Sequence, residues 1–272
     1  MGSVIAILLV LGLTSIATAQ EATPKGSMDI VAQAATTALG GRPGQEAPYV
    51  GGRGLITEEL ATGMFINPTS GTLPQYQGTV QYCALIFKVA DNTVVGHGAI
   101  ATFGVTDWLE VGGGGLLADL PGPADDPVVG GPQVRLRLLK DERWLPEMSV
   151  GGVFLFGDKE LEKNTVYIAA SKGVKVSDTG FVRSARGHIG FRQAWVEVGE
   201  DGSFGFVGGE IELSNHLFTV AEVSNKAGGA TKVPWAAGIQ VRHPGGFGFT
   251  LAAVQTPLSD KVAVYVGVGI NF

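Results

Sequence analysis

The sequence has little cysteine and little charge, and each shortage excludes a common class of protein. Cys83 is the only cysteine in 272 residues, so the chain can form no intramolecular disulfide and no cysteine-based zinc site. Charged residues make up 16%, and the formal net charge is -6. No basic stretch is present that could follow a phosphate backbone. Nucleic acid is therefore not an expected partner.

The sequence motifs of common enzymes and long apolar runs are also missing. The chain contains no G-x-S-x-G, no H-E-x-x-H and no phosphate-binding loop. Ser214-Asn215-His216 has the residue types of a hydrolase, but three consecutive residues cannot form a working triad, because neighbours on a strand point to opposite faces. We therefore predict no enzymatic activity, no metal site and no cofactor. Beyond residue 19 no apolar run reaches the length of a membrane-spanning helix.

The N-terminus is typical of an exported protein. Val4 to Leu13 forms a short apolar core, and Ala17-Thr18-Ala19 matches the A-x-A pattern of a cleavage site. No Lys or Arg precedes Val4, but the apolar run is too short to cross a bilayer as a helix. Residues 1-19 are therefore predicted to be a secretory signal peptide.

Glycine and alternating polarity are what the sequence has in abundance. Its 42 glycines argue against a mainly helical protein, because glycine costs about 1 kcal/mol in a helix interior. About twelve segments of roughly ten residues carry apolar side chains at every second position, which predicts strands. The approximate spans are 81-90, 93-103, 106-117, 131-140, 147-157, 164-175, 180-193, 203-213, 216-224, 233-243, 246-255 and 261-272.

These strands are predicted to form an all-β fold, an antiparallel transmembrane β-barrel over 81-272. Strands of about 9–11 residues match a tilted crossing of a bilayer, whereas strands of globular sheets usually have about 5–6. The less apolar face is rich in Gly and Ala with isolated charges, which suits a narrow lumen better than the solvated face of a soluble sandwich. A closed barrel also leaves no strand edge exposed.

The lengths of the connections alternate along the chain, as they do in outer-membrane barrels. One series is short, with links near 104-105, 176-179, 214-215 and 244-245. The other is longer, with links near 118-130, 158-163, 194-202, 225-232 and 256-260. Residues 141-147 belong to the short series but are longer. The alternation predicts that 118-130 is external and that the C-terminus is periplasmic.

Aromatic residues near the strand ends have two explanations of equal weight. They could form the girdles that mark the two membrane interfaces of a barrel. They could equally be ordinary core aromatics. The residues are Trp108, Trp144, Trp195, Trp235, Phe247 and Phe272.

Residues 20-80 differ from the rest of the chain. Lys25 to Leu39 contains a short possible helix, and the remainder is rich in the glycine and proline of loops and turns. We consider a periplasmic extension, a plug inside the barrel and a poorly ordered leader.

Nine charged residues are predicted to point into the lumen. They could form a charged constriction that selects solutes, or a cross-strand network that fills and stiffens the lumen. Opposite charges on neighbouring strands, as with Arg186 and Glu210, favour the network. The nine are Glu110, Arg135, Arg137, Arg186, Arg192, Glu210, Glu212, Glu222 and Arg242.

The last strand ends in a recognisable pattern. Its apolar face runs to the terminal residue, and Tyr265, Gly267, Ile270 and Phe272 resemble the C-terminal signal that the bacterial barrel-assembly machinery reads. The resemblance implies that machinery as a partner, and outer-membrane lipid around the apolar face.

Four further stretches are similar to outer-membrane barrels associated with exopolysaccharide production and secretion. They are G-L-I-T-E-E-L-A-T-G-M-F-I-N-P-T-S-G-T-L-P-Q at 54-75, F-G-V-T-D-W-L-E-V-G-G at 103-113, V-R-L-R-L-L-K at 134-140 and V-Y-I-A-A-S-K at 166-172. Thr-Ser-Gly replaces the small residues that usually follow the proline. The resemblance implies an outer-membrane location and a channel or docking role for a polar solute or glycan. A structural barrel for envelope integrity or adhesion, and a secreted carbohydrate-binding β-sandwich, are the alternatives.

Overall fold

The structure is a computed structural model that describes residues 63–89, 92–120, 126–142, 144–177, 179–213, 216–227, 232–243, 245–256 and 261–272. The predicted signal peptide (1-19), the possible helix at 25-39 and the other residues before 63 lie outside these ranges. Among the described residues there is no helix of the length and apolarity needed to cross a membrane.

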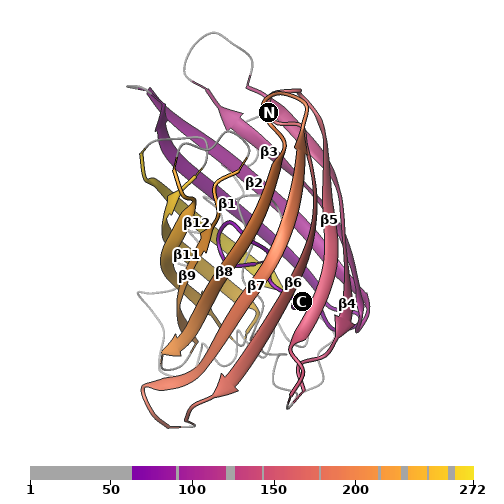
Figure 1. The fold of residues 1–272 in the computed structure, drawn as a ribbon, viewed down its shortest axis with the longest axis vertical. Coiled ribbons are helices and arrows are strands. Elements are labelled where there is room, and N and C mark those ends of the chain that lie inside the picture. Colours follow the sequence, from indigo (N-terminus) through magenta and orange to yellow (C-terminus); the bar gives the residue numbers. More distant parts are fainter. Residues whose placement is uncertain are drawn as a thin grey trace, which may run out of the picture. The chain divides into compact units, whose positions relative to one another are not determined.

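Within the described ranges the chain forms twelve antiparallel strands that close into one barrel (Figure 1). Each strand pairs with its neighbours in sequence, and the first pairs with the last. This confirms the predicted all-β barrel and excludes a two-sheet sandwich. The strands are β1 (Gly78–Val89), β2 (Asn92–Thr106), β3 (Leu109–Asp119), β4 (Val128–Leu139), β5 (Glu147–Gly157), β6 (Lys163–Lys175), β7 (Val182–Val196), β8 (Gly202–Leu213), β9 (Leu217–Ser224), β10 (Trp235–Arg242), β11 (Phe247–Gln255) and β12 (Ala263–Asn271).

The seam between β1 and β12 closes the barrel. It runs from the pair Thr79 and Asn271 to the pair Ile86 and Val264. Two backbone hydrogen bonds finish it, from Gly78 N to Phe272 O (2.8 Å) and from Phe272 N to Gly78 O (2.9 Å). We call the end of the barrel that carries these bonds the terminal end. The opposite end, where residues 158–162 link β5 to β6, is the loop end.

The outer wall of the barrel is apolar. In β12, Val264 and Ile270 are exposed while Ala263 and Tyr265, on either side of Val264, are fully buried, as the period of two requires. The same alternation exposes large apolar side chains on the other strands, such as Ile189 at 62%. A continuous band of this kind is the lipid-facing surface of a membrane-spanning barrel.

The aromatic residues near the strand ends belong to this outer surface. All six are exposed, which rules out the alternative that they are core residues. Four lie near the terminal end and two near the loop end, as interfacial girdles do. They are Trp108, Trp144, Phe247 and Phe272 at the terminal end, and Trp195 and Trp235 at the loop end.

Several predicted strand ends were shifted by up to three residues, and two of the predicted links were wrong as a result. The expected link at 104-105 lies inside β2, which continues to Thr106, and the expected link at 194-202 begins only after Val196. Gly104 resembled a strand breaker in the sequence. Position 104 requires glycine for a different reason: a Cβ there would lie 2.1 Å from the carbonyl oxygen of Pro74. The backbone of residues 73–77 crosses β2 at this point, with hydrogen bonds from Tyr76 N to Gly104 O and from Gly104 N to Gln77 O.

We expect Gly104→Ala to destabilise the folded barrel by about 1–3 kcal/mol, because two backbone segments must move apart to admit the methyl group. The matched control is Gly96→Ala on the inner face of the same strand, where the new Cβ would meet nothing closer than 3.9 Å. The temperature at which each purified protein loses its heat-modifiable gel mobility measures the difference. Equal temperatures for the two variants would contradict the proposed crowding at Gly104.

Candidate functional site in the barrel lumen

Residues 63–73 lie buried inside the ring of strands, and residues 74–77 lead from them to β1 (Figure 1, indigo). We call residues 63–77 the luminal segment. Gly63 pairs with Pro68, and Met64 N donates to Asn67 O (3.0 Å), which makes a tight turn. The Phe65 ring lies 6.2 Å from that of Tyr265, centroid to centroid. Met64, Phe65 and Ile66 are fully buried in an apolar cluster with inward residues of the wall. The turn is therefore packed as a core element and not merely enclosed.

Glu222 of β9 holds this turn through its carboxylate. One oxygen accepts hydrogen bonds from Phe65 N (2.7 Å) and Ile66 N (2.6 Å). The other accepts from Asn67 N (3.0 Å) and Asn67 Nδ2 (2.7 Å). Asn67 Nδ2 also donates to Ser224 Oγ (3.1 Å). A carboxylate that accepts several N–H groups is a strong clamp, because hydrogen bonds to a charged acceptor are about twice as strong as neutral ones.

A second clamp holds the other part of the luminal segment. Glu110 of β3 accepts a hydrogen bond from Leu73 N (2.8 Å). Arg135 of β4 donates from Nη1 to the carbonyl oxygen of Gly71 and from Nε to Tyr167 Oη (2.7 Å). Both Glu110 and Arg135 are almost completely buried. These two predicted luminal charges therefore bind the chain's own backbone.

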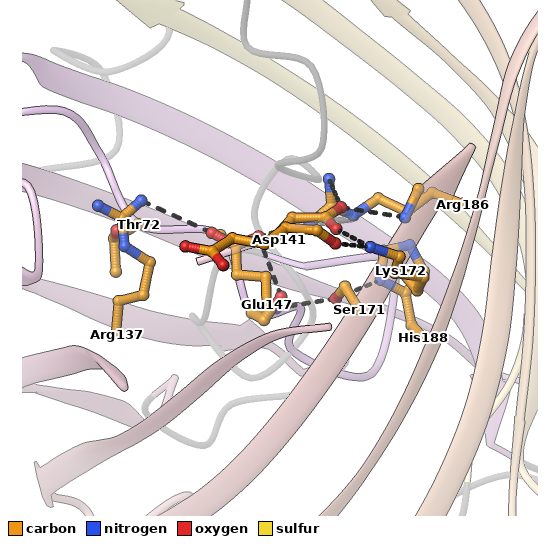
Figure 2. Close-up of polar contacts among 12 residues, drawn as sticks. Thr72, Arg137, Asp141, Glu147, Ser171, Lys172, Arg186 and His188 are labelled. Carbon is orange, nitrogen blue, oxygen red and sulfur yellow. Dashed lines mark hydrogen bonds and ion pairs between the residues drawn. The ribbon is translucent and has the colours of Figure 1, made fainter. Parts of the chain in front are cut away.

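A network of ion pairs crosses from β4 to β7 near the terminal end (Figure 2). Glu147 of β5 lies at its centre, 3.7 Å from Arg137 Nη1 and 2.5 Å from Arg186 Nη2. Asp141, in the link between β4 and β5, lies 3.9 Å from Arg186 and accepts a hydrogen bond of 2.6 Å from Lys172 Nζ. The network thus ties four strands together.

This network also reaches the luminal segment. Ser70 Oγ donates to Glu147 Oε2 (3.2 Å), and Ser70 N donates to Ser171 Oγ (3.3 Å). Ser171 Oγ is hydrogen-bonded to His188 Nδ1 at 2.8 Å (Figure 2). His188 Nε2 in turn lies 3.9 Å from Glu210 Oε1. Ser70 is therefore the residue through which the segment joins this network of ion pairs.

Arg242 extends the polar interior to β10. Its Nη2 lies 2.5 Å from Glu210 Oε2 and also donates to Gln240 Oε1 (2.5 Å). Gln240 Nε2 then donates to the carbonyl oxygen of Met64 (3.0 Å). The Arg242 guanidinium also lies 4.2 Å from the centre of the Phe218 ring. A chain of contacts therefore connects the wall at β8 to the first residues of the luminal segment.

The structure places all nine predicted luminal charges on the inner face, but their partners differ. Glu110, Arg135 and Glu222 contact the luminal segment directly. Arg137, Arg186 and Arg242 reach it through one other side chain, and Glu210 reaches it through two. Glu212 accepts a hydrogen bond from Ser184 Oγ (2.8 Å) on the wall. Arg192 lies over the ring of Phe204, 4.3 Å from its centre.

Sequence reasoning missed several members of the site, chiefly Glu147, Gln240, Ser171 and Asp141. Glu147 begins a strand with two fairly apolar faces, so its direction was not evident. Gln240 was on the correct face, but an amide carries no charge to attract notice. Asp141 lies in a link, where an acidic residue is ordinarily a solvated one. Only the inner-face periodicity could have pointed to Gln240 and Ser171.

Asp141 lies outside the membrane-spanning strands, and its surroundings shift its pKa. Partial burial by itself raises that pKa. The hydrogen bonds from Lys172 and from the Gly173 amide, together with the charge of Arg186, outweigh burial and hold the pKa of Asp141 below its ordinary value of 3.8. The stabilisation is therefore complete above the unfolded pKa and is lost as the pH falls through the lower folded pKa.

Asp141→Asn should lower the stability of the barrel by about 0.5–1 kcal/mol at neutral pH, because the ion pair is partly exposed. The difference from the unchanged protein should shrink as the pH is lowered from about 5 to about 2. Thermal loss of heat-modifiability at each pH measures it. In a Lys172→Gln background the substitution should cost less, since the main hydrogen-bond donor is gone. A cost that is the same at every pH would contradict this account.

Within the described ranges no group of three or more His, Cys, Asp or Glu side chains is placed to hold a metal ion. What the lumen contains instead is a set of charged and polar side chains that form hydrogen bonds with the backbone of the luminal segment. Such contacts can be exchanged for water without breaking a covalent bond.

No protein-family profile and no curated protein matches the sequence. Among solved structures, the chain is similar to KdgM porin, with a TM-score of 0.51 at 10% sequence identity over 71% of this chain and 99% of that chain. A mutant of the porin from Rh. blastica has a TM-score of 0.31 at 9% identity over 72% and 99% of the two chains. The outer-membrane protein OprG from Pseudomonas aeruginosa has a TM-score of 0.21 at 13% identity over 75% and 99%.

The fold defines the class of protein. A closed antiparallel barrel with an apolar outer wall, aromatic girdles and the fold of KdgM porin is a porin-like β-barrel of the bacterial outer-membrane type.

Proposed function

We propose that this protein is an outer-membrane channel whose lumen is held closed by the luminal segment and opens when that segment leaves its clamps. The terminal end lies in the periplasm and the loop end outside, as the alternating connection lengths predict. Most of the nine inward charges bind the luminal segment or one another in the closed state, and all nine line the solute path in the open state.

The observation that carries the proposal is the way the luminal segment is held. Glu222 on one wall and Glu110 and Arg135 on the other bind it through side chains that water or a solute could replace. A segment meant only to fill the barrel could have been held by apolar contacts alone. Its polar part instead contacts charged side chains, and these could be hydrated by water if the segment left.

A reversible crosslink between the segment and the wall tests the proposal. Asn67 and Ser224 are both buried, and their side chains approach to 3.1 Å. Asn67→Cys with Ser224→Cys, in a Cys83→Ser background, should form a disulfide that locks the segment in place. In planar bilayers we expect ion currents from the full-length reduced protein and none from the oxidised protein.

Asn67→Cys alone, in the same background and with the same oxidant, is the matched control and should conduct in both states. Equal currents from the locked and the reduced protein would overturn the gating role. An absence of current in every form would favour the other candidate, a structural barrel with a filled lumen. The fully buried apolar turn around Phe65 is the observation that supports this second candidate.

The resemblance to exopolysaccharide-associated barrels supports a finer form of the proposal, in which the solute is a glycan. Liposome-swelling rates with neutral oligosaccharides of increasing length test it on the same reduced and oxidised proteins. Swelling with oligosaccharides that stops on oxidation is expected. Passage of salt alone would mean that the channel serves small ions and that the glycan link is wrong.

A further inference from the structure

The half of the lumen next to the loop end contains a cavity of about 330 Å³, which we call the outer chamber. Inward residues of seven strands supply most of its wall, including Leu85, Leu116, Leu155 and Phe204. Sites for small organic ligands usually measure about 300–1,000 Å³. The outer chamber is therefore at the small end of that range, large enough for one compact apolar molecule or one acyl chain.

The deep wall of the outer chamber is apolar and closely packed. Cys83, Val153 and Leu155 line it and are each less than 5% exposed. They belong to the same apolar cluster that surrounds Met64 and Phe65. A polar solute placed there would leave its hydroxyl groups without hydrogen-bond partners, which is costly. The chemistry of this wall selects an apolar occupant.

The rim of the outer chamber is acidic. Glu160 and Glu162 reach it from the β5–β6 link and Glu200 from the β7–β8 link, against a single cation, Lys163. Nearby, Lys159 Nζ and Glu197 Oε1 lie 3.6 Å apart and offset one another. The side chains at the mouth are partly solvated, so a head group there could stay hydrated. Three carboxylates around one ammonium group disfavour an anionic head group and accept a neutral or cationic one.

We propose that the outer chamber binds a single-chain amphiphile with an uncharged or cationic head group. The chain occupies the apolar wall between Leu85 and Leu155, and the head group lies among the rim carboxylates. The polar network near the terminal end has no part in this site. The inference therefore goes beyond the proposed channel and does not require the luminal segment to move.

Photo-crosslinking of a dodecan-1-ol that carries a diazirine near its chain end tests this directly. The full-length protein is reconstituted in lipid nanodiscs, irradiated and mapped by mass spectrometry. Adjacent residues of β1 distinguish the two environments, because Leu85 and Phe87 face the outer chamber and Ile86 faces lipid. We expect saturable labelling at Leu85 and Phe87, and labelling that rises without saturation at Ile86.

Competition by unlabelled amphiphiles identifies the head group. Excess dodecan-1-ol or dodecyltrimethylammonium should remove the labelling at Leu85 and Phe87. Dodecanoate should compete about tenfold less well, because its carboxylate meets the acidic rim. Equally strong competition by dodecanoate would overturn the assignment of the head group.

Two variants fill the outer chamber from different strands, Ala118→Phe on β3 and Ala194→Phe on β7. Each should abolish the saturable labelling while the barrel stays heat-modifiable. Ala99→Phe adds the same ring to the lipid-facing side of β2 and is the matched control that should change nothing. The proposal would be overturned if Leu85 and Phe87 were not labelled in the unchanged protein. It would also be overturned if both filled variants were labelled there as strongly as the unchanged protein.

Discussion

Glu222→Gln should release the luminal segment while leaving the barrel wall intact. The carboxylate accepts two hydrogen bonds on each oxygen, all from N–H groups. An amide keeps one oxygen and presents an NH2 group to donors on the other side, whichever way it is turned. Two buried hydrogen bonds to a charged acceptor are lost, and the N–H groups of the luminal segment that made them are left without an acceptor. Together these losses should weaken the binding of the segment by about 3–5 kcal/mol.

Hydrogen–deuterium exchange of the Phe65, Ile66 and Asn67 amides measures this release. A loss of 3 kcal/mol or more corresponds to exchange about a hundredfold faster, because about 1.4 kcal/mol is one factor of ten. If the proposed gating is right, the same variant should also show a higher open probability in planar bilayers. Faster exchange tests only the Glu222 clamp, so it is expected even if the protein is not a channel.

Glu212→Gln is the matched control for this prediction. It makes the same chemical change on the inner face of the neighbouring strand β8, where Glu212 bonds to Ser184 of the wall. Exchange of the luminal-segment amides should stay unchanged in this variant. Slow exchange at Phe65 to Asn67 in Glu222→Gln would mean that apolar packing holds the turn and that the carboxylate clamp is not needed.

Deletion of Phe272 should reduce the folded barrel in the outer membrane by an order of magnitude. The residue takes part in both backbone hydrogen bonds that finish the seam: its O accepts from Gly78 N, and its N donates to Gly78 O. Phe272 is 53% exposed at the terminal end, where the proposed assembly signal would be accessible to the assembly machinery. Without it the last pair of the seam is lost, together with the terminal residue of the proposed assembly signal formed with Tyr265, Gly267 and Ile270.

The heat-modifiable fraction in isolated outer membranes measures assembly in cells. Phe247→Ala is the matched control, because it removes an exposed aromatic from the adjacent strand at the same end, where Phe247 pairs with Ile270. That variant should assemble normally. Refolding of the deletion variant into pure lipid vesicles separates the two roles of Phe272. If the variant refolds normally in vesicles but fails to assemble in cells, the loss is one of recognition by the assembly machinery. Normal assembly in cells would contradict the proposed assembly signal.

The strands and their two faces could be predicted from the sequence because each depends on local polarity. In β10, Ile239 and Val241 face outward while Gln240 and Arg242 face the lumen, as the alternation of their side chains predicts. The lipid outside and the narrow lumen inside impose opposite requirements on neighbouring residues. A period of two is then visible without any knowledge of the partners.

Strand boundaries were less predictable where tertiary contacts overrode a local pattern. Gly104 is a glycine because the backbone of residues 73–77 passes close to it, and not because the strand ends there. A sequence shows only that a position is glycine. The end of a strand and the close approach of another backbone segment both favour glycine, so the sequence alone does not tell them apart.

By itself, the sequence determined the approximate number of strands, the face on which each inward charge lies and the apolar terminal strand, because these follow from period-two patterning. Only the tertiary structure decided what the charges meet. Glu222 and Asn67 are 155 residues apart, and the luminal segment has no periodicity that would place it in the barrel. The outer chamber likewise depends on the volume left between side chains of many strands, and no single stretch of sequence encodes that volume.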